Sequence, residues 1–239
     1  MITRRREFLL AGAALGIGGA TTRTLLAADA AKPTEDVSAI EDLMREHGVL
    51  RRILLIYEEC VRRLGAKTEV NDPVAGTLRP SAELVQKFVE DYHEKLEETY
   101  IFPEFEKRSQ LVPLVKVLRE QHTAGRALTQ TMLRLLAPDT SAKSLLATPE
   151  SRRTATERCC HAFLRMYCPH AAREDTVLFP ALKKILSAKQ LDELGDKFED
   201  EENRRFGADG FSKTVEKVAA IEKQLGIYDL GQFTPKPTK

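Results

Sequence analysis

Residues 93–103 read HEKLEETYIFP, and residues 170–180 read HAAREDTVLFP. Both segments follow one pattern, His-x-x-x-Glu-acid-Thr-x-aliphatic-Phe-Pro. An isolated histidine precedes each copy, His47 before the first and His122 before the second. These histidines also match locally, because each follows a glutamate or glutamine and precedes an arginine by four residues. The chain therefore contains two similar halves, each with one isolated histidine and one His-x-x-x-Glu pair.

Helical patterns separated by short breaks surround these segments. Ser38 with Glu41, and Ser187 with Gln190, form predicted capping boxes, and Ser81 is the predicted N-cap of a second helix. Asn-Asp-Pro, Gly76 and Pro80 predict a loop over 66–80. The expected long helices span 38–65, 81–107, 113–136 and 149–186, the last capped by Thr148, with shorter ones over 187–207 and 212–225. We predict an all-α protein, an up-down-up-down four-helix bundle with a C-terminal helical extension.

The composition agrees with this fold class. Of 239 residues, 42% are hydrophobic and 6% aromatic, and tryptophan is absent. Such a chain can bury one sizeable core. The formal net charge is +1, which gives no bulk attraction to nucleic acid or to a membrane surface. We therefore expect no nucleic-acid partner, and the sequence leaves a protein partner open.

The first thirty residues predict a segment outside the folded domain. Residues 3–9, TRRREFL, resemble a twin-arginine export signal, and Ala28-Asp29-Ala30 offers a cleavage site. The apolar run over 9–20 is too short to span a bilayer permanently, so no membrane span is expected after cleavage. The alternative is a basic N-terminus followed by an apolar helix. We predict a signal peptide over 1–30, the bundle over 31–186, C-terminal helices and tail over 187–239, and a periplasmic or other extracytoplasmic location.

The histidines and glutamates of the repeat predict a dinuclear metal site. Residues four apart share one face of a helix, so His93 lies beside Glu97 and His170 beside Glu174. Four helices around one axis can direct four imidazoles and two carboxylates to one point. Two buried carboxylates facing each other would repel without a cation between them. The candidate ligands, with the glutamates as bridges, are His47, His93, Glu97, His122, His170 and Glu174, a set that suits two iron ions or, alternatively, manganese.

These motifs resemble those of the hemerythrin-like, or HHE cation-binding, family, and the resemblance covers residues 38–186. It implies that the four histidines are terminal ligands and that the two glutamates bridge the metals. It further implies that one iron takes His47 and His93 and the other His122 and His170. Oxygen-carrying members have a second histidine four residues after the ligand of the third helix, where this chain has Arg126. Glu94, Tyr100, a water molecule or nothing fills that position.

Several functions are compatible with such a centre. The favoured one is reversible binding or sensing of O2, NO or a small oxidant such as peroxide. The alternatives are a di-iron oxidase or peroxidase, an iron storage or scavenging protein, and a helical interaction module without metal. No nucleotide-binding loop or nucleophile–base pair occurs in the sequence, which favours binding over catalysis.

The remaining candidates have simpler interpretations. His161 lies half a turn away from His170 in azimuth and is excluded as a ligand. Core positions are the most economical role for Met44, Leu50, Leu96, Met132, Ile101-Phe102 and Leu178-Phe179, although the last two pairs could instead line a gas channel. Cys60 is placed to form a disulfide with Cys159 or Cys160, and buried thiols are the alternative. Cys168 completes the four cysteines.

Overall fold

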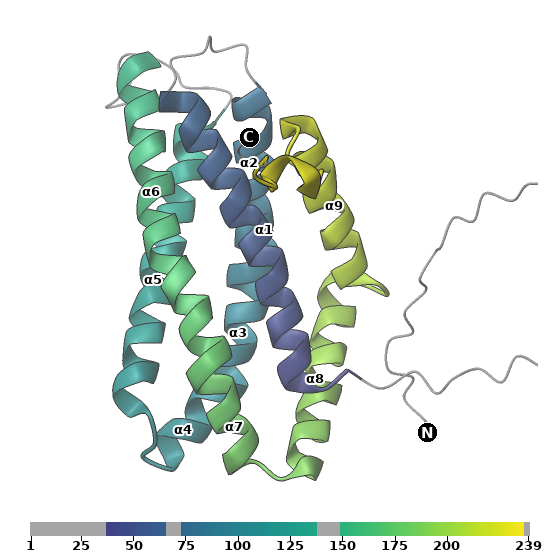
Figure 1. Cartoon of the computed structure of the whole chain (residues 1–239). Coiled ribbons are helices and arrows are strands. Elements are labelled where there is room, and N and C mark those ends of the chain that lie inside the picture. Colours follow the sequence, from purple (N-terminus) through teal and green to yellow (C-terminus); the bar gives the residue numbers. More distant parts are fainter. Residues whose placement is uncertain (1–36, 66–72, 138–148, 237–239) are drawn as a thin grey trace, which may run out of the picture.

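The computed structural model describes residues 37–65, 73–137 and 149–236. Four long helical segments lie side by side in it (Figure 1). The first segment is α1 (Ala39–Gly65), and the third is α5 (Val112–Leu135). The second segment is a continuous run of α2 (Pro73–Leu84), η1 (Val85–His93), α3 (Glu94–Leu96), η2 (Glu97–Ile101) and α4 (Phe102–Lys107). The fourth is a continuous run of α6 (Pro149–Arg173), η3 (Glu174–Leu178) and α7 (Phe179–Ile185). The three η segments named here are π-helical. The predicted all-α bundle is confirmed, while residues 1–30 and Thr148 lie outside the described residues.

The C-terminal part adds a helical hairpin to the bundle. It consists of α8 (Ala188–Phe206), α9 (Gly210–Leu225) and a short 3-10 helix, η4 (Leu230–Phe233). The Ser187 hydroxyl accepts from the backbone of Gln190, and the Gln190 side chain accepts from the backbone of Ser187, so the predicted capping box is confirmed. Both long helices pack on α1, and α9 also packs on α2. The division into domains at residue 186 stays a prediction.

The start of the second helix was predicted wrongly. Helix α2 begins at Pro73 and contains Pro80, and Ser81 donates its hydroxyl to the carbonyl of Thr77 rather than capping a helix. Pro80 removes one backbone hydrogen bond. Leu78 and Ala82 are nevertheless fully buried, and α2 contacts α1, α5 and α9. This packing outweighs the local cost of the proline.

The core follows the apolar stripes of the helices. Leu50, Leu96 and Met132 are buried as predicted, but Met44 is 41% exposed. Met44 falls beside the buried stripe of α1 rather than on it, since positions 43, 47, 50 and 54 face the interior. Phe88 packs against Phe206 and Phe211, which fixes the C-terminal hairpin to the bundle. Within the described residues, no helix is both long and apolar enough to span a membrane.

Candidate metal centre

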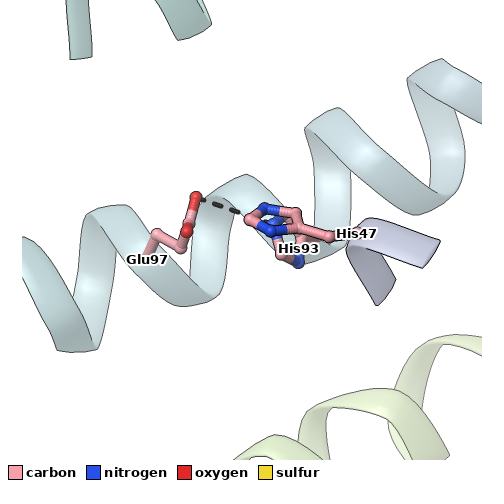
Figure 2. A group of neighbouring side chains, drawn as sticks. All are labelled: His47, His93 and Glu97. Atoms are coloured by element: carbon pink, nitrogen blue, oxygen red, sulfur yellow. Dashed lines mark ion pairs between the residues drawn. The ribbon is translucent and has the colours of Figure 1, made fainter. Parts of the chain in front are cut away.

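The six candidate ligands meet in the interior of the bundle. His47 comes from α1, His93 ends η1, His122 lies on α5 and His170 lies on α6, while Glu97 and Glu174 begin η2 and η3. None of the six is more than 4% exposed. Figure 2 shows the part of the group formed by His47, His93 and Glu97, with His47 reaching in from a separate helix. The sequence predicted this gathering from the repeat alone.

Each carboxylate lies between histidines of both halves of the chain. The Oε2 atom of Glu97 is 3.8 Å from Nε2 of His93 and 3.4 Å from Nε2 of His122. The Oε2 atom of Glu174 is 3.1 Å from Nε2 of His170 and 3.4 Å from Nε2 of His47. The imidazoles pair as His47 with His93 and His122 with His170, with ring centroids 4.7 and 5.0 Å apart. This is the arrangement expected of two carboxylates that each connect two histidine pairs.

A hydrogen bond at Nδ1 holds each imidazole in place. The partners are Asp175 for His47 at 2.7 Å, Glu46 for His93 at 2.7 Å, Glu98 for His122 at 3.1 Å and Gln121 for His170 at 2.8 Å. These oxygen atoms accept, so each Nδ1 carries the hydrogen and each Nε2 lone pair faces the centre. Such partners fix the tautomer of metal-ligating histidines and make the ring a stronger ligand.

Burial and mutual repulsion shift the protonation of the central groups. Burial raises the pKa of Glu97 well above its usual range, and the charge of Glu174 raises it further. Burial also acts on Glu174, but the facing His170 and His47 outweigh it and hold the pKa of that carboxyl below its usual range. Burial lowers the pKa of His122 to about 4 and lowers that of His93 too. His93 and His122 are therefore neutral at pH 7, as metal ligation requires.

The inward-facing atoms lack partners of their own. Within the part of the chain that the structure describes, the atoms without a hydrogen bond include Nε2 of His47, His93 and His122 and both carboxylate oxygens of Glu97 and Glu174. Buried polar atoms normally have hydrogen-bond partners. A cluster of buried nitrogen and oxygen lone pairs without such partners therefore indicates a binding site for a cation. A set of imidazoles and carboxylates on bundle helices suits iron or manganese, and these residues fit such a pair.

Comparison with known proteins gives the family. The sequence model of the hemerythrin HHE cation binding domain matches residues 38–182, most of the chain and all six candidate ligands. The chain belongs to the hemerythrin HHE cation-binding family. It is also 51% identical over 199 residues to uncharacterized proteins of Mycobacterium bovis and Mycobacterium tuberculosis, an alignment that covers 83% of this chain and 74% of each relative. No solved structure matches significantly.

Both glutamates of this hemerythrin-domain protein begin a π-helical turn. The backbone N–H of Phe102 donates to the carbonyl of Glu97, and that of Phe179 donates to the carbonyl of Glu174. Pro103 and Pro180 follow directly, and a proline ring would clash with the carbonyl four residues earlier in a regular α-helix. The wider turn accommodates the proline, as π-turns at functional sites often do. The Phe-Pro pair of each repeat is therefore the sequence signal for this distortion.

The phenylalanines of the two Phe-Pro pairs cover the imidazoles. Phe102 stacks on His122 and Phe179 stacks on His47, each with ring centroids 5.4 Å apart. Ile101 and Leu178 beside them are also fully buried. These four side chains are packed core residues, as the simpler interpretation of the sequence expected.

Arg126 stands where the oxygen-carrying members have a second histidine on the third helix, but its side chain pairs with carboxylates instead of facing the candidate histidine ligands. Its guanidinium pairs with Glu94 at 2.7 Å and with Glu98 at 2.6 Å. The hydroxyl of Tyr167 donates to the other oxygen of Glu94 at 2.6 Å. Tyr100 packs on Phe198 of α8 instead. The structure therefore places Glu94 near His122, held by Arg126 and Tyr167.

Sequence reasoning missed the residues that support the histidines, although the repeat contains them. Glu46 and Gln121 each precede a candidate ligand, and Glu98 and Asp175 each follow one. The arginine of each half extends this support, since Arg51 pairs with Asp175 and Arg126 with Glu98. Polar residues that recur next to the candidate ligands in both halves could therefore have predicted these supporting hydrogen bonds.

The other candidates lie outside the centre. His161 is exposed, in agreement with its predicted orientation. The proposed disulfide was wrong: Cys60, Cys159 and Cys160 are buried thiols, and Cys168 is an exposed one. Cys60 lies 3.8 Å from the Thr77 hydroxyl, and Cys159 donates to the carbonyl of Leu128. Cys60 of α1 and Cys159 of α6 are thus both buried but contact different partners.

Replacing Asp175 by alanine is expected to weaken metal binding about 10- to 100-fold, the usual cost of losing a residue that orients a ligand. The reason is that Nδ1 of His47 loses its acceptor. Asp175→Asn keeps an acceptor oxygen and should lose less. Metal titration of both variants measures the effect, and Thr176→Ala next to it serves as a control. Equal affinity of Asp175→Ala and the unmodified protein would contradict this role.

Gly125 on α5 makes room for Tyr167. A Cβ atom at position 125 would lie 1.9 Å from the Tyr167 hydroxyl. We expect Gly125→Ala to displace the tyrosine from Glu94 and to lower the free energy of unfolding by about 1–3 kcal/mol. Gly48 on α1 has no atom within 4 Å of such a Cβ, so Gly48→Ala should stabilise by about 0.5–1 kcal/mol. Urea unfolding of the two variants tests the contrast, and equal shifts would refute it.

Proposed function

We propose that this protein holds two iron ions at His47, His93, Glu97, His122, His170 and Glu174 and uses them to bind or sense O2, NO or a small oxidant such as peroxide. The observation that supports this best is the position of each carboxylate between one histidine of each half. Manganese is the alternative metal. By resemblance, His47 and His93 would hold one iron and His122 and His170 the other.

The residues around the centre prepare it for a small ligand. The acceptors at Nδ1 keep four Nε2 lone pairs directed inward, so little rearrangement is needed on metal binding. Phe102 and Phe179 stack on two of the imidazoles and exclude water from that side. When bound, a pair of ferrous ions supplies reversible coordination of diatomic ligands and one-electron redox chemistry. No feature of the sequence supplies electrons from an organic cofactor, which favours reversible binding of O2 over its reduction.

The proposal includes export. Residues 1–30 resemble a twin-arginine signal, and this route carries folded proteins to the periplasm or another extracytoplasmic space. Detection of the mature chain in a periplasmic fraction, starting near residue 31, would support this part. Lysine in place of both Arg5 and Arg6 should retain the protein inside the cell, and unchanged localisation of that variant would contradict the signal.

Metal analysis with an optical spectrum tests the central proposal. The protein is purified anaerobically, loaded with ferrous iron, exposed to air and then placed under vacuum. About two irons per chain and near-ultraviolet bands that appear with O2 and reverse under vacuum are the expected result. Absence of stoichiometric metal in the folded protein would overturn the ligand assignment.

The same measurement separates the alternatives. Irreversible conversion to a stable ferric form, with O2 consumed while reductant is present, would indicate an oxidase instead of a reversible O2 carrier. Uptake of many irons per chain would indicate storage. A folded protein that binds no iron would indicate a helical interaction module without metal.

A further inference from the structure

Tyr167 is a buried redox-capable side chain beside the centre that the proposed function does not use. It lies on α6, three residues before His170, and is 1% exposed. Its ring meets the imidazole of His170 edge-on, with centroids 5.3 Å apart. Its hydroxyl donates to Glu94 at 2.6 Å, and Arg126 pairs with the other oxygen of Glu94. Tyr167 thus contacts a candidate ligand through its ring and a carboxylate through its oxygen.

Several contacts hold this phenol in one position. The absence of a side chain at Gly125 lets the hydroxyl reach Glu94, because a Cβ there would overlap it. Phe163 also packs against the ring, at 4.3 Å between centroids. The 2.6 Å hydrogen bond gives the phenolic proton a fixed acceptor. A tyrosine placed this way can lose an electron while its proton moves only along the hydrogen bond.

Tyr167 is also among the residues that line a surface groove between α1 and α6. This cavity of about 330 Å³ is lined by Leu54, Leu55, Leu164 and Ala171 as well as Tyr167, with charged groups from Arg51 and Glu58. Its size lies at the lower end of the range for small-molecule sites. A neutral aromatic ring suits the leucine walls, whereas an unpaired buried charge would be costly.

We propose that Tyr167 carries single electrons from a small phenol in this groove to the metal centre and so gives the protein a phenol peroxidase activity. The inference rests on the proposed iron centre. It adds a substrate site and a route for electrons between that site and the ligand His170.

The reaction balances as a peroxidase cycle. Tyr167 loses one electron toward the centre while its proton shifts to Glu94. The phenol then returns one electron to the tyrosyl radical, the proton moves back from Glu94, and the phenol releases its own proton to solvent. Two such passages supply two electrons, and two protons come from solvent. The O–O bond of one hydrogen peroxide breaks, so that one peroxide and two phenols give two waters and two phenoxyl radicals.

Freeze-quench electron paramagnetic resonance on the iron-loaded full chain tests the relay. After iron content is measured, hydrogen peroxide is added without a reductant. We expect a tyrosyl radical in the unmodified protein and its loss in Tyr167→Phe. Tyr57→Phe is the matched control, because Tyr57 is equally buried but its ring contacts Phe163 rather than a candidate ligand. This variant should keep the signal.

A second measurement covers a Tyr167→Phe variant that fails to fold. Peroxide treatment of the unmodified protein with a spin trap, followed by peptide mass spectrometry, should place the trapped radical on Tyr167. Added 4-methoxyphenol should quench the radical and be consumed. Leu55→Glu, a change at a side chain that is 44% exposed, should slow that consumption without preventing radical formation.

The outcomes separate this proposal from the iron centre itself. Two bound irons with no tyrosyl radical, or with a radical that persists in Tyr167→Phe, would overturn the relay alone. Unchanged phenol consumption in Leu55→Glu would overturn the groove as the substrate site. Failure of the folded protein to bind iron would overturn both the relay and the proposed function.

Discussion

Replacing Glu97 by glutamine is expected to abolish stoichiometric iron binding and to leave the metal-free protein within about 1 kcal/mol of its original stability. Glutamine keeps the size and planarity of the side chain. It removes an acid that is fully buried, faces Glu174 and has no hydrogen bond at either oxygen. The pKa of Glu97 is raised by burial and by Glu174, so a neutral amide resembles the state that the metal-free protein prefers. A cation, by contrast, needs the carboxylate.

The two readouts must be measured on the same preparations. Metal analysis gives iron per chain, and urea unfolding in the presence of a chelator gives the stability without metal. Glu104→Gln is a suitable control, because Glu104 lies on α4 with Lys107 and Arg108 as surface partners. It should leave iron content unchanged. Full iron content in Glu97→Gln would refute the bridging role of Glu97, and a large loss of metal-free stability would show that Glu97 is a structural residue.

Ferrous iron is expected to raise the free energy of unfolding of the unmodified protein by about 4 kcal/mol for each bound ion when free iron exceeds its dissociation constant a thousandfold. The reason is linkage, since the folded chain gathers six donors that an unfolded chain does not. Satisfying atoms that now lack hydrogen bonds adds to the preference for the folded state. Thermal melting with iron, and again after chelation, measures the shift.

Glu97→Gln provides the control for this stabilisation. Its melting temperature should not respond to iron, because one connecting carboxylate is missing. If iron stabilised both proteins equally, the metal would be acting at surface carboxylates and not at the centre. Manganese in place of iron tests the alternative metal in the same assay.

The repeat made most of the bundle and the ligand cluster predictable. A His-x-x-x-Glu pair fixes two side chains on one helix face, and a second copy of that pair requires the helices to face each other. The beginning of the second helix was not predictable in this way. Pro80 and Gly76 are local breakers, and only the burial of Leu78 and Ala82 against neighbouring helices overrides them.

The surroundings of the ligands depend on contacts between distant segments. Nothing in the local sequence of Asp175 shows that it reaches His47, which lies 128 residues away in the chain. The position of Arg126 was visible, but its pairing with Glu94 and Glu98 required the packing of α5 against the second helical run. The contact of Tyr167 with Glu94 depends in the same way on Gly125. The sequence alone does not show that a side chain at position 125 would overlap Tyr167, because this depends on how the helices pack.

The exchange of contacts between the two halves has a consequence for how the protein folds. Asp175 of the second half supports His47 of the first, and Glu98 of the first supports His122 of the second. Neither half of the bundle therefore has all of its metal ligands held in place before it packs against the other half. A bound pair of cations would stabilise the packing of one half of the bundle against the other more than it would stabilise either half alone. Assembly of the complete set of six donors therefore requires contacts between distant parts of the chain, and we expect a nascent chain to reach its full affinity for metal only after its second half has been made.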